Sequence, residues 1–287
     1  MPRRSAVKLG MIPVIDTRQS FRPLCRELVA LLRELRAEDW ERPTLAGTWL
    51  VRDIVAHLSD TALRRLSFDR DGKLPLNPPR PIRDERDLAA FINDLNATWI
   101  RAAQRLSPRA LTDLYATTSE ALSDFVENVR LDGPACFPVS WAGPAGSQAW
   151  LDIGREFTEI WHHGAQIRDA VGAGPFSEAR WLHDVLAIAM HAIPHAYREV
   201  PADVDQSLMV EILGPSGGLW TLRARSTGWE MDEGSQPDPT AKVTMSDEIA
   251  WRVFFNALPL TAASAMVRVE GNAALAAPLL RVRSVVV

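Results

Sequence analysis

Residues 156–169, with the sequence EFTEIWHHGAQIRD, carry apolar side chains at helical spacing beside a row of polar ones. Glu159 and His163 are four residues apart, so a helix places them on one face, one turn from each other. Roughly a hundred residues earlier, residues 47–57 (GTWLVRDIVAH) show the same periodicity and end on His57. If two helices bring these residues together, they offer two imidazoles and one carboxylate. Such a donor set can hold a divalent metal and leave one coordination position open.

Each half of this pattern also has a structural explanation that needs no metal. Glu159 and His163 lie beside an apolar stripe, and such a polar row is commonly the solvated edge of a helix. His57 follows Ile54 by three residues, and a lone histidine that faces a helical core is more often a hydrogen-bonded core residue than a ligand. A helix turns His162 about 100° away from His163, which makes Glu159 and His162 the less favoured pair.

A rival set of candidate ligands is His191, His195 and Glu199, spaced four residues apart near the end of the helical part. These three would share a face only in an unbroken helix. Pro194 removes a backbone hydrogen bond in that region, so this set is the less favoured metal site. The two cysteines, Cys25 and Cys136, form no CxxC motif and are expected to be inert.

Composition indicates an ordinary globular protein. Of the 287 residues, 47% are hydrophobic and 24% are charged, and the net charge of -4 argues against a nucleic-acid surface. The first residues do not resemble a signal peptide, and no apolar run approaches the roughly 18–20 residues that a membrane span needs. We therefore expect a cytoplasmic protein with small-molecule partners, and neither nucleic acid nor membrane among them.

A change in periodicity divides the chain near residue 200. Apolar spacing predicts helices over about residues 24–35, 49–66, 84–106, 108–130, 147–171 and 178–199, the last kinked by Pro194. After residue 201, short alternating segments predict strands over 208–213, 219–225, 241–245 and 266–270, with helices over 247–255 and 273–280. The expected organisation is a helical domain over residues 1–200 and a small α+β domain over residues 201–287.

Residues 49–57, in which a tryptophan opens the helix, an Arg-Asp pair follows and a histidine closes the motif, resemble the second helix of DinB-like proteins. The resemblance is to the mycothiol-dependent maleylpyruvate isomerase branch in particular, and residues 159–169 resemble a later helix of the same family. It covers most of residues 20–200 and implies a four-helix-type bundle that binds a divalent metal, usually zinc, through His57, Glu159 and His163. Residues 267–280 resemble the end of the sterol-carrier-like α+β domain which this branch adds.

Two positions depart from the family pattern. Many members place Ser or Thr directly after the tryptophan, but here Leu50 occupies that position, so Thr48 is expected to cap the helix. Isomerase-like members often carry Asp three residues after the second histidine, where this chain has Gln166. The second departure leaves the exact reaction open.

The resemblance implies a reaction in which the metal activates a low-molecular-weight thiol such as mycothiol, because zinc deprotonates a coordinated thiol. The thiolate would attack a small electrophile and give S-transfer or thiol-assisted isomerisation. The branch also uses an arginine of the C-terminal domain, for which Arg223 and Arg225 are candidates that would stabilise developing charge. Two alternatives remain: a carrier for an apolar small molecule, and a metal-dependent hydrolase with Glu156 as general base. Another divalent metal could replace zinc, and the protein could be a monomer or a homodimer.

Overall fold

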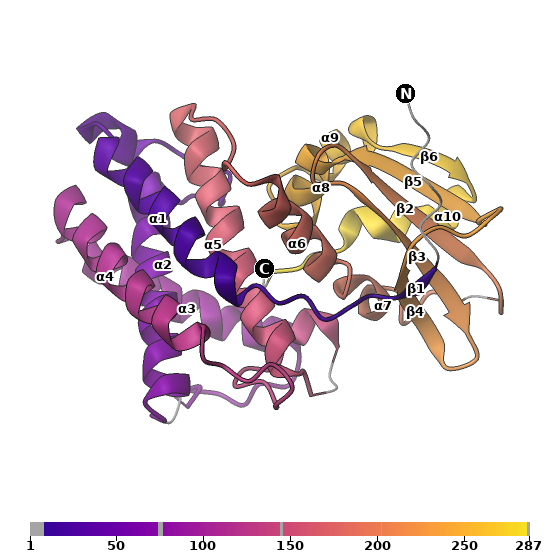
Figure 1. Ribbon diagram of the computed structural model, residues 1–287, viewed down its shortest axis with the longest axis horizontal. Coiled ribbons are helices and arrows are strands. Elements are labelled where there is room, and N and C mark those ends of the chain that lie inside the picture. The colour runs from indigo at the N-terminus through magenta and orange to yellow at the C-terminus, as the bar shows by residue number, and fades with distance from the viewer. Residues whose placement is uncertain (1–8, 74–76, 144–145, 202, 286–287) are drawn as a thin grey trace. The chain divides into compact units, whose positions relative to one another are not determined.

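The computed structural model describes residues 9–73, 77–143, 146–201 and 203–285 (Figure 1). Contacts divide the chain into two compact units. The helical unit comprises Asp16–Pro138 and Gly146–Ser177, and the sheet unit is built mainly of Glu178–Val285. None of the helices in the described ranges is long and apolar enough to cross a membrane.

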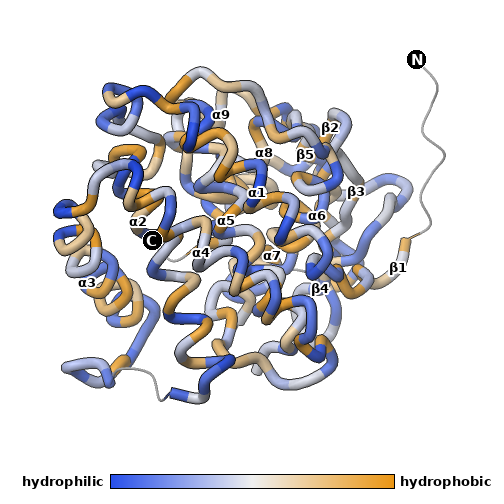
Figure 2. The backbone as a smooth tube through the Cα atoms, turned by 60° about the vertical axis from the view of Figure 1, so that its left-hand side comes forward, coloured by the Kyte–Doolittle hydropathy of each residue, from blue (hydrophilic) through white to orange (hydrophobic). Residues whose placement is uncertain are grey.

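The helical unit is a four-helix arrangement with one additional helix. Helices α1 and α2 each pack against both α4 and α5, and α3 packs against α2. The core residues Leu24, Ile54, Leu122 and Phe157, one from each of the four helices, are at most 1% exposed. Along the tube in Figure 2, apolar and polar stretches alternate through the helices, as expected for helices that bury one face. The helices are α1 Arg18–Glu34, α2 Val51–Arg65, α3 Glu85–Ala103, α4 Pro108–Val126 and α5 Ala149–Val171.

The start of α2 differs from the sequence prediction at its cap. Leu50 is the N-cap residue, and its backbone N–H donates to the Asp53 carboxylate at 3.0 Å. No side-chain hydrogen bond from Thr48 caps this helix, so the expectation that Thr48 would cap it was wrong. The carboxylate of Asp53, in the first turn, accepts a hydrogen bond from an N–H that would otherwise be unpaired. Its negative charge also interacts favourably with the positive end of the helix dipole.

The sheet unit contains a six-stranded sheet in the order β1-β4-β3-β2-β5-β6. Neighbouring strands are antiparallel except β2 and β5, which run parallel with Leu208 opposite Ala241. Every second residue of β2 and β5, among them Val210 and Val243, is fully buried, as expected for a sheet that packs one face on a core. The strands are β1 Gly10–Met11, β2 Ser207–Leu213, β3 Gly218–Arg225, β4 Gly228–Glu233, β5 Ala241–Ser246 and β6 Arg268–Gly271.

The helices of the sheet unit are short. Helices α8 and α10 pack on β5, and α7 packs on β4. The sequence pattern predicts four of the strands, whereas β1, β4 and α9 were not predicted. The helices are α6 Ala179–Ala189, α7 Ala192–Ala196, α8 Asp247–Phe254, α9 Leu260–Met266 and α10 Ala273–Ala276, followed by a 3₁₀ turn over Ala277–Arg281. The expected fold class, a helical bundle followed by an α+β domain, is confirmed.

The predicted helix over residues 178–199 is two helices. Helix α6 ends at Ala189 and α7 begins at Ala192, so the break precedes Pro194. The His191 N–H bonds the Ile188 carbonyl at 3.1 Å, a tight turn that ends α6. Pro194 then lies in the first turn of α7, where a missing N–H costs little. The prediction of a single kinked helix was therefore wrong.

The two compact units do not divide at residue 200. Helix α6 belongs with the sheet unit, because it packs against α8 and because the Ser216 hydroxyl donates to the Ala179 carbonyl at 2.7 Å. These contacts place the division near residues 177–178.

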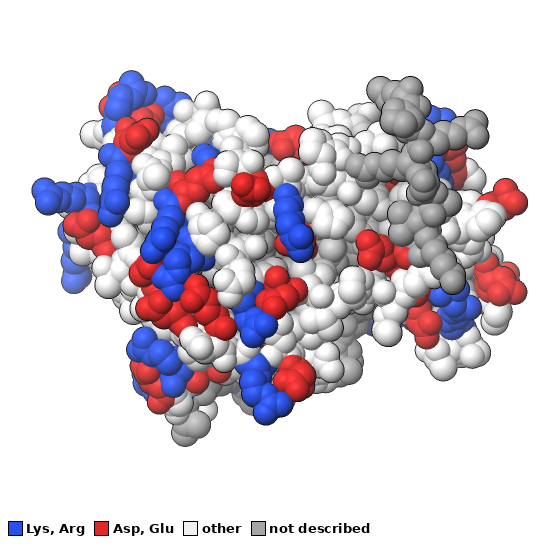
Figure 3. Space-filling model, in the orientation of Figure 1, with Lys and Arg blue, Asp and Glu red and all other residues white. Residues whose placement is uncertain are grey.

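Charged side chains of both signs are interspersed on the face shown in Figure 3. On the helical unit, Arg22 of α1 pairs with Glu120, Asp124 and Glu127 of α4 and the segment that follows it. This face therefore carries no large patch of a single sign, which agrees with the small net charge.

Candidate metal centre

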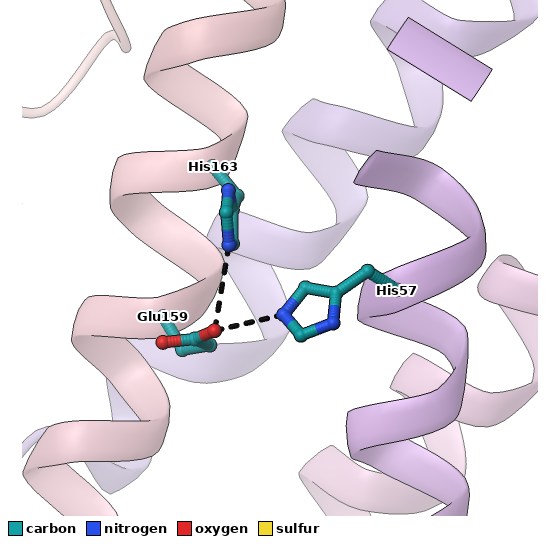
Figure 4. A group of neighbouring side chains, drawn as sticks. All are labelled: His57, Glu159 and His163. Carbon is teal, nitrogen blue, oxygen red and sulfur yellow. Dashed lines mark hydrogen bonds and ion pairs between the residues drawn. The ribbon is translucent and has the colours of Figure 1, made fainter. Parts of the chain in front are cut away.

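Helices α2 and α5 bring His57, Glu159 and His163 together (Figure 4). One carboxylate oxygen, Oε1 of Glu159, lies 2.8 Å from Nε2 of His57 and 3.4 Å from Nε2 of His163. The three potential ligand atoms all lie within 4.8 Å of one another. Within the described ranges, no other group of three or more histidine, cysteine or acidic side chains meets this criterion.

The spacing of these atoms fits a tetrahedral ion after a small adjustment. Nitrogen and oxygen ligands at about 2.0–2.2 Å from zinc are about 3.3 Å from one another. The 3.4 Å contact of His163 already has this length, and the 2.8 Å contact of His57 would need to open by a few tenths of an ångström. The two histidine side chains are at most 8% exposed, whereas the Glu159 side chain is 19% exposed. An exchangeable ligand would therefore reach the centre on the carboxylate side.

The indole of Trp49, two residues before α2 begins, packs against both imidazoles. Its ring centre lies 4.9 Å from that of His57 and 5.8 Å from that of His163, on which it stacks at 29°. Trp49 is half-buried. The indole thus lowers the exposure of the two nitrogen donors and restricts the rotation of their rings.

Burial and hydrogen bonding set the charge states of the centre. Burial lowers the pKa of His57, although the neighbouring Glu159 opposes this shift. Burial alone would raise the pKa of Glu159, but the close imidazoles of His163 and His57 outweigh it and hold that pKa well below its usual range. At neutral pH the centre therefore offers a neutral imidazole and an ionised carboxylate, which are the forms that a metal requires.

His162 is excluded from the centre by its own hydrogen bond. Its Nδ1 lies 2.8 Å from the backbone carbonyl of Thr158, one turn earlier on α5. Burial, reinforced by the adjacent His163, lowers the pKa of His162 to about 3. His162 is therefore a neutral, buried packing residue, and His163 is the histidine that faces Glu159.

We expect the metal-free protein to lose stability as the pH falls below about 6.5. Burial lowers the pKa of His162 to about 3 and that of His191 to about 4, so between pH 6 and pH 4 the unfolded chain binds protons that the folded protein does not. Each histidine then reduces the free energy of unfolding by up to about 1.4 kcal/mol per pH unit. Urea unfolding at pH 7, 6 and 5 measures this slope. His162→Gln should flatten it, and an unfolding midpoint that does not change with pH would contradict the expectation.

A buried ion cluster lies two turns from the centre on the same two helices. Arg65, at the end of α2, binds Asp152 of α5 through two nitrogens at 2.6 and 2.8 Å, and both side chains are at most 2% exposed. The Phe137 N–H donates to the same carboxylate at 3.0 Å. Burial alone would raise the pKa of Asp152, but the hydrogen bonds and charges of Arg65 and Arg155 keep it low.

Glu156 belongs to this cluster. Its carboxylate lies 3.6 Å from Arg65 and 3.3 Å from Arg155, and its side chain is 4% exposed. A carboxylate held between two guanidinium groups is poorly placed to activate water. The hydrolase alternative, which needs Glu156 as general base, therefore gains no support from this geometry.

Arg223 and Arg225 lie on β3 of the sheet unit, and both are paired with acidic residues of β4. Arg223 donates to Asp232 through two nitrogens, one of them at 2.7 Å, and Arg225 lies 3.5 Å from Glu230. Both guanidinium groups thus hold carboxylates of the neighbouring strand. A role for either arginine in charge stabilisation stays a prediction.

His191, His195 and Glu199 do not form a second ligand group within the described ranges. The break between α6 and α7 removes the continuous helical face which their spacing would need. The Glu199 side chain is 87% exposed and lies 3.9 Å from Arg198.

The ion pair between Arg65 and Asp152 and the packing of the Trp49 indole on the imidazoles were not predicted from the sequence. A signal for Asp152 was present, because Asp152, Glu156, Glu159 and His163 are spaced by four, three and four residues. This spacing places all four on one face of α5. An acidic stripe on a helix that is otherwise apolar predicts a buried cation partner.

One family model and two crystal structures are similar to this chain. The model of the mycothiol maleylpyruvate isomerase N-terminal domain matches residues 21–168. The crystal structure of a histidine-to-alanine mutant of the mycothiol-dependent maleylpyruvate isomerase is similar with a TM-score of 0.53 at 12% identity, and the match covers 90% of this chain and 93% of that chain. A second crystal structure of the mycothiol-dependent maleylpyruvate isomerase gives a TM-score of 0.50 at 12% identity over 84% of this chain and 88% of that chain.

At such low identity, the structural likeness establishes a shared fold. No curated protein matches the sequence. The family match, in contrast, extends over just over half of the 287 residues and includes His57, Glu159 and His163. This chain therefore belongs to the family defined by the mycothiol maleylpyruvate isomerase N-terminal domain.

Proposed function

We propose that the chain is a metal-dependent enzyme which activates a low-molecular-weight thiol, such as mycothiol, for attack on a small electrophile. The observation that carries this proposal is the convergence of His57, Glu159 and His163 in a member of this family. We propose zinc as the metal, because two imidazoles and one carboxylate form a donor set typical of catalytic zinc.

The protein's own residues supply the site but not the nucleophile. Burial raises the pKa of the Cys25 thiol to about 12, and burial with the nearby Asp69 raises the pKa of Cys136. Neither of the two cysteines in the chain is therefore a thiolate at neutral pH. A bound zinc ion would lower the pKa of a coordinated external thiol and so provide the missing nucleophile.

The remaining residues hold and shield the centre. Glu159 supplies the single negative charge of the ligand set, and the indole of Trp49 limits the access of water to the two imidazoles. In an isomerisation, the thiolate would add to a double bond, the new single bond would rotate, and the thiol would leave again. In an S-transfer, the carbon–sulfur bond would persist in the product. A thiol cosubstrate in its reduced form fits our proposal of a cytoplasmic location.

The test is thiol-dependent turnover by zinc-loaded protein that carries no histidine tag. Mycothiol and maleylpyruvate are mixed with the protein, and NMR follows the conversion of the cis to the trans double bond. A parallel reaction with mycothiol and an activated aryl halide is analysed for the S-conjugate by mass spectrometry. We expect one of the two products, and we expect a chelator to abolish its formation. Zinc-loaded protein that forms neither product would overturn the proposal.

One feature of the sheet unit bears on the alternative of a carrier protein. A pocket of about 310 Å³, open to the surface, is lined by Ala196, Ala274, Ala277, Pro278 and Arg281. This volume is at the lower end of the range for small-molecule sites. A carrier would bind an apolar ligand without consuming thiol, so the turnover assay separates the two functions.

A further inference from the structure

The second nitrogen of His163 has a defined partner. Gln166, three residues later on α5, places its amide oxygen Oε1 at 2.8 Å from Nδ1 of His163, and Gln166 is only 2% exposed. An amide oxygen can only accept, so the Nδ1–H of His163 donates to it. The other ring nitrogen, Nε2, therefore carries no proton in the neutral ring, and it faces Glu159.

This tautomer matters for the contact between His163 and Glu159. When Nδ1 carries the proton of a neutral ring, Nε2 presents a lone pair to Oε1 of Glu159 at 3.4 Å. Two acceptors that face each other at this distance repel, unless a cation lies between them. A second proton on Nε2 or a metal ion can fill this position, and only the metal leaves the imidazole in its neutral form.

His57 has no equivalent support. Its Nδ1 is buried and has no hydrogen-bond partner within the described ranges. The ring of His57 is oriented by its contact with Glu159 and by packing against Trp49. Of the two imidazoles, only His163 is therefore held by a buried polar group behind it.

Building on the proposed function, we propose that Gln166 is the positioning residue of the metal centre. It fixes His163 as the Nδ1–H tautomer before the metal arrives. Its amide is neutral, so Glu159 contributes the one negative charge of the set, and a divalent ion there retains a net charge of +1. A net positive centre favours an anionic exchangeable ligand, such as a thiolate, over a neutral one. A carboxylate in place of the amide would make His163 a stronger donor but would cancel this excess charge.

The test compares Gln166→Leu, which removes the hydrogen-bond acceptor, with Gln166→Glu. Glutamate is nearly isosteric with glutamine and retains an acceptor for the Nδ1–H of His163. Metal affinity is measured by competition with a chromophoric zinc chelator. We expect Gln166→Leu to weaken zinc binding roughly 10- to 100-fold, as the loss of an orienting partner usually does. We expect Gln166→Glu to bind zinc at least as tightly as the unmodified protein. Gln19→Leu, at an exposed position of α1, is the matched control and should change nothing.

A second readout is independent of metal binding and of activity. Long-range ¹⁵N–¹H correlation spectra of the metal-free protein at alkaline pH report which nitrogen of His163 carries the proton. We expect the Nδ1–H form in the unmodified protein and in Gln166→Glu, and a shift toward the Nε2–H form in Gln166→Leu. An unchanged tautomer together with an affinity within twofold in Gln166→Leu would overturn the inference, as would a Gln166→Glu variant that binds zinc no better than Gln166→Leu. If the unmodified protein binds no metal, the proposed function fails, whereas the tautomer still tests the role of Gln166.

Discussion

His57→Ala is expected to leave the purified protein without stoichiometric zinc. His57 is the only ligand candidate that α2 provides, and the two that remain lie one turn apart on α5. Two ligands from one helix cannot enclose a tetrahedral ion, so we expect affinity to fall by more than the roughly 100-fold that loss of an outer-shell partner costs. Metal content per chain after dialysis against micromolar zinc measures the effect, and thiol-dependent turnover should fall with it.

The control for this variant is His183→Ala. His183 lies on α6 of the sheet unit, where its ring contacts the Ser216 carbonyl at 3.2 Å, and its loss should leave zinc content unchanged. Circular dichroism confirms that both variants keep their helices. His57→Ala protein that still holds one zinc per chain would contradict the assignment of His57 as a ligand.

Arg65→Met is expected to cost about 3–5 kcal/mol of stability, the range typical for the loss of one partner of a buried ion pair. The substitution leaves the Asp152 carboxylate, which is at most 2% exposed, without its main partner, and it also removes a cation from beside Glu156. Methionine replaces much of the arginine volume, so the lost charge dominates the effect. Urea unfolding at pH 7 measures the free energy change.

Arg26→Met provides the matched comparison on the surface. Arg26 pairs with Glu120 at 2.8 Å, but its side chain is 66% exposed, so its loss should cost less than about 1 kcal/mol. Adding Asp152→Leu to Arg65→Met should recover part of the lost stability, because the buried Asp152 carboxylate that lost its partner is then removed. Equal losses in the free energy of unfolding for Arg65→Met and Arg26→Met would contradict the expectation that the buried pair contributes more to stability than the exposed one.

Local periodicity was sufficient to predict most of the helices and to place two of the three candidate ligands, Glu159 and His163, on one helical face. The four-residue spacing of Glu159 and His163 predicts a common face whatever the rest of the chain does. The same periodicity turns His162 away, and its bond to the Thr158 carbonyl agrees with this. Strand β2 was equally predictable, because Leu208, Val210 and Ile212 alternate with less buried residues.

Long-range contacts were not predictable from such patterns. His57 meets Glu159 across 102 residues, and only resemblance to a family supplied that pairing. Arg65 meets Asp152 across 87 residues, and although the acidic stripe on α5 indicates a cationic partner, nothing in the sequence identifies Arg65 as that partner. Strand β4 was missed because it has only two apolar residues, Trp229 and Met231, among three acidic ones. Its hydrogen bonds to β3, not its own side chains, define it as a strand.

Helices α2 and α5 are joined at two levels, by His57 with Glu159 and by Arg65 with Asp152. Residue numbers rise along α2 as they fall along α5, so these contacts fix two antiparallel helices in one register. The side chains of His57, Arg65, Asp152, Glu159 and His163 are enough to fix this register. The other bundle helices have only to supply apolar surface, which many sequences can provide. Such an architecture can diverge widely while it keeps its centre, and a shared fold at 12% identity is the outcome that it permits.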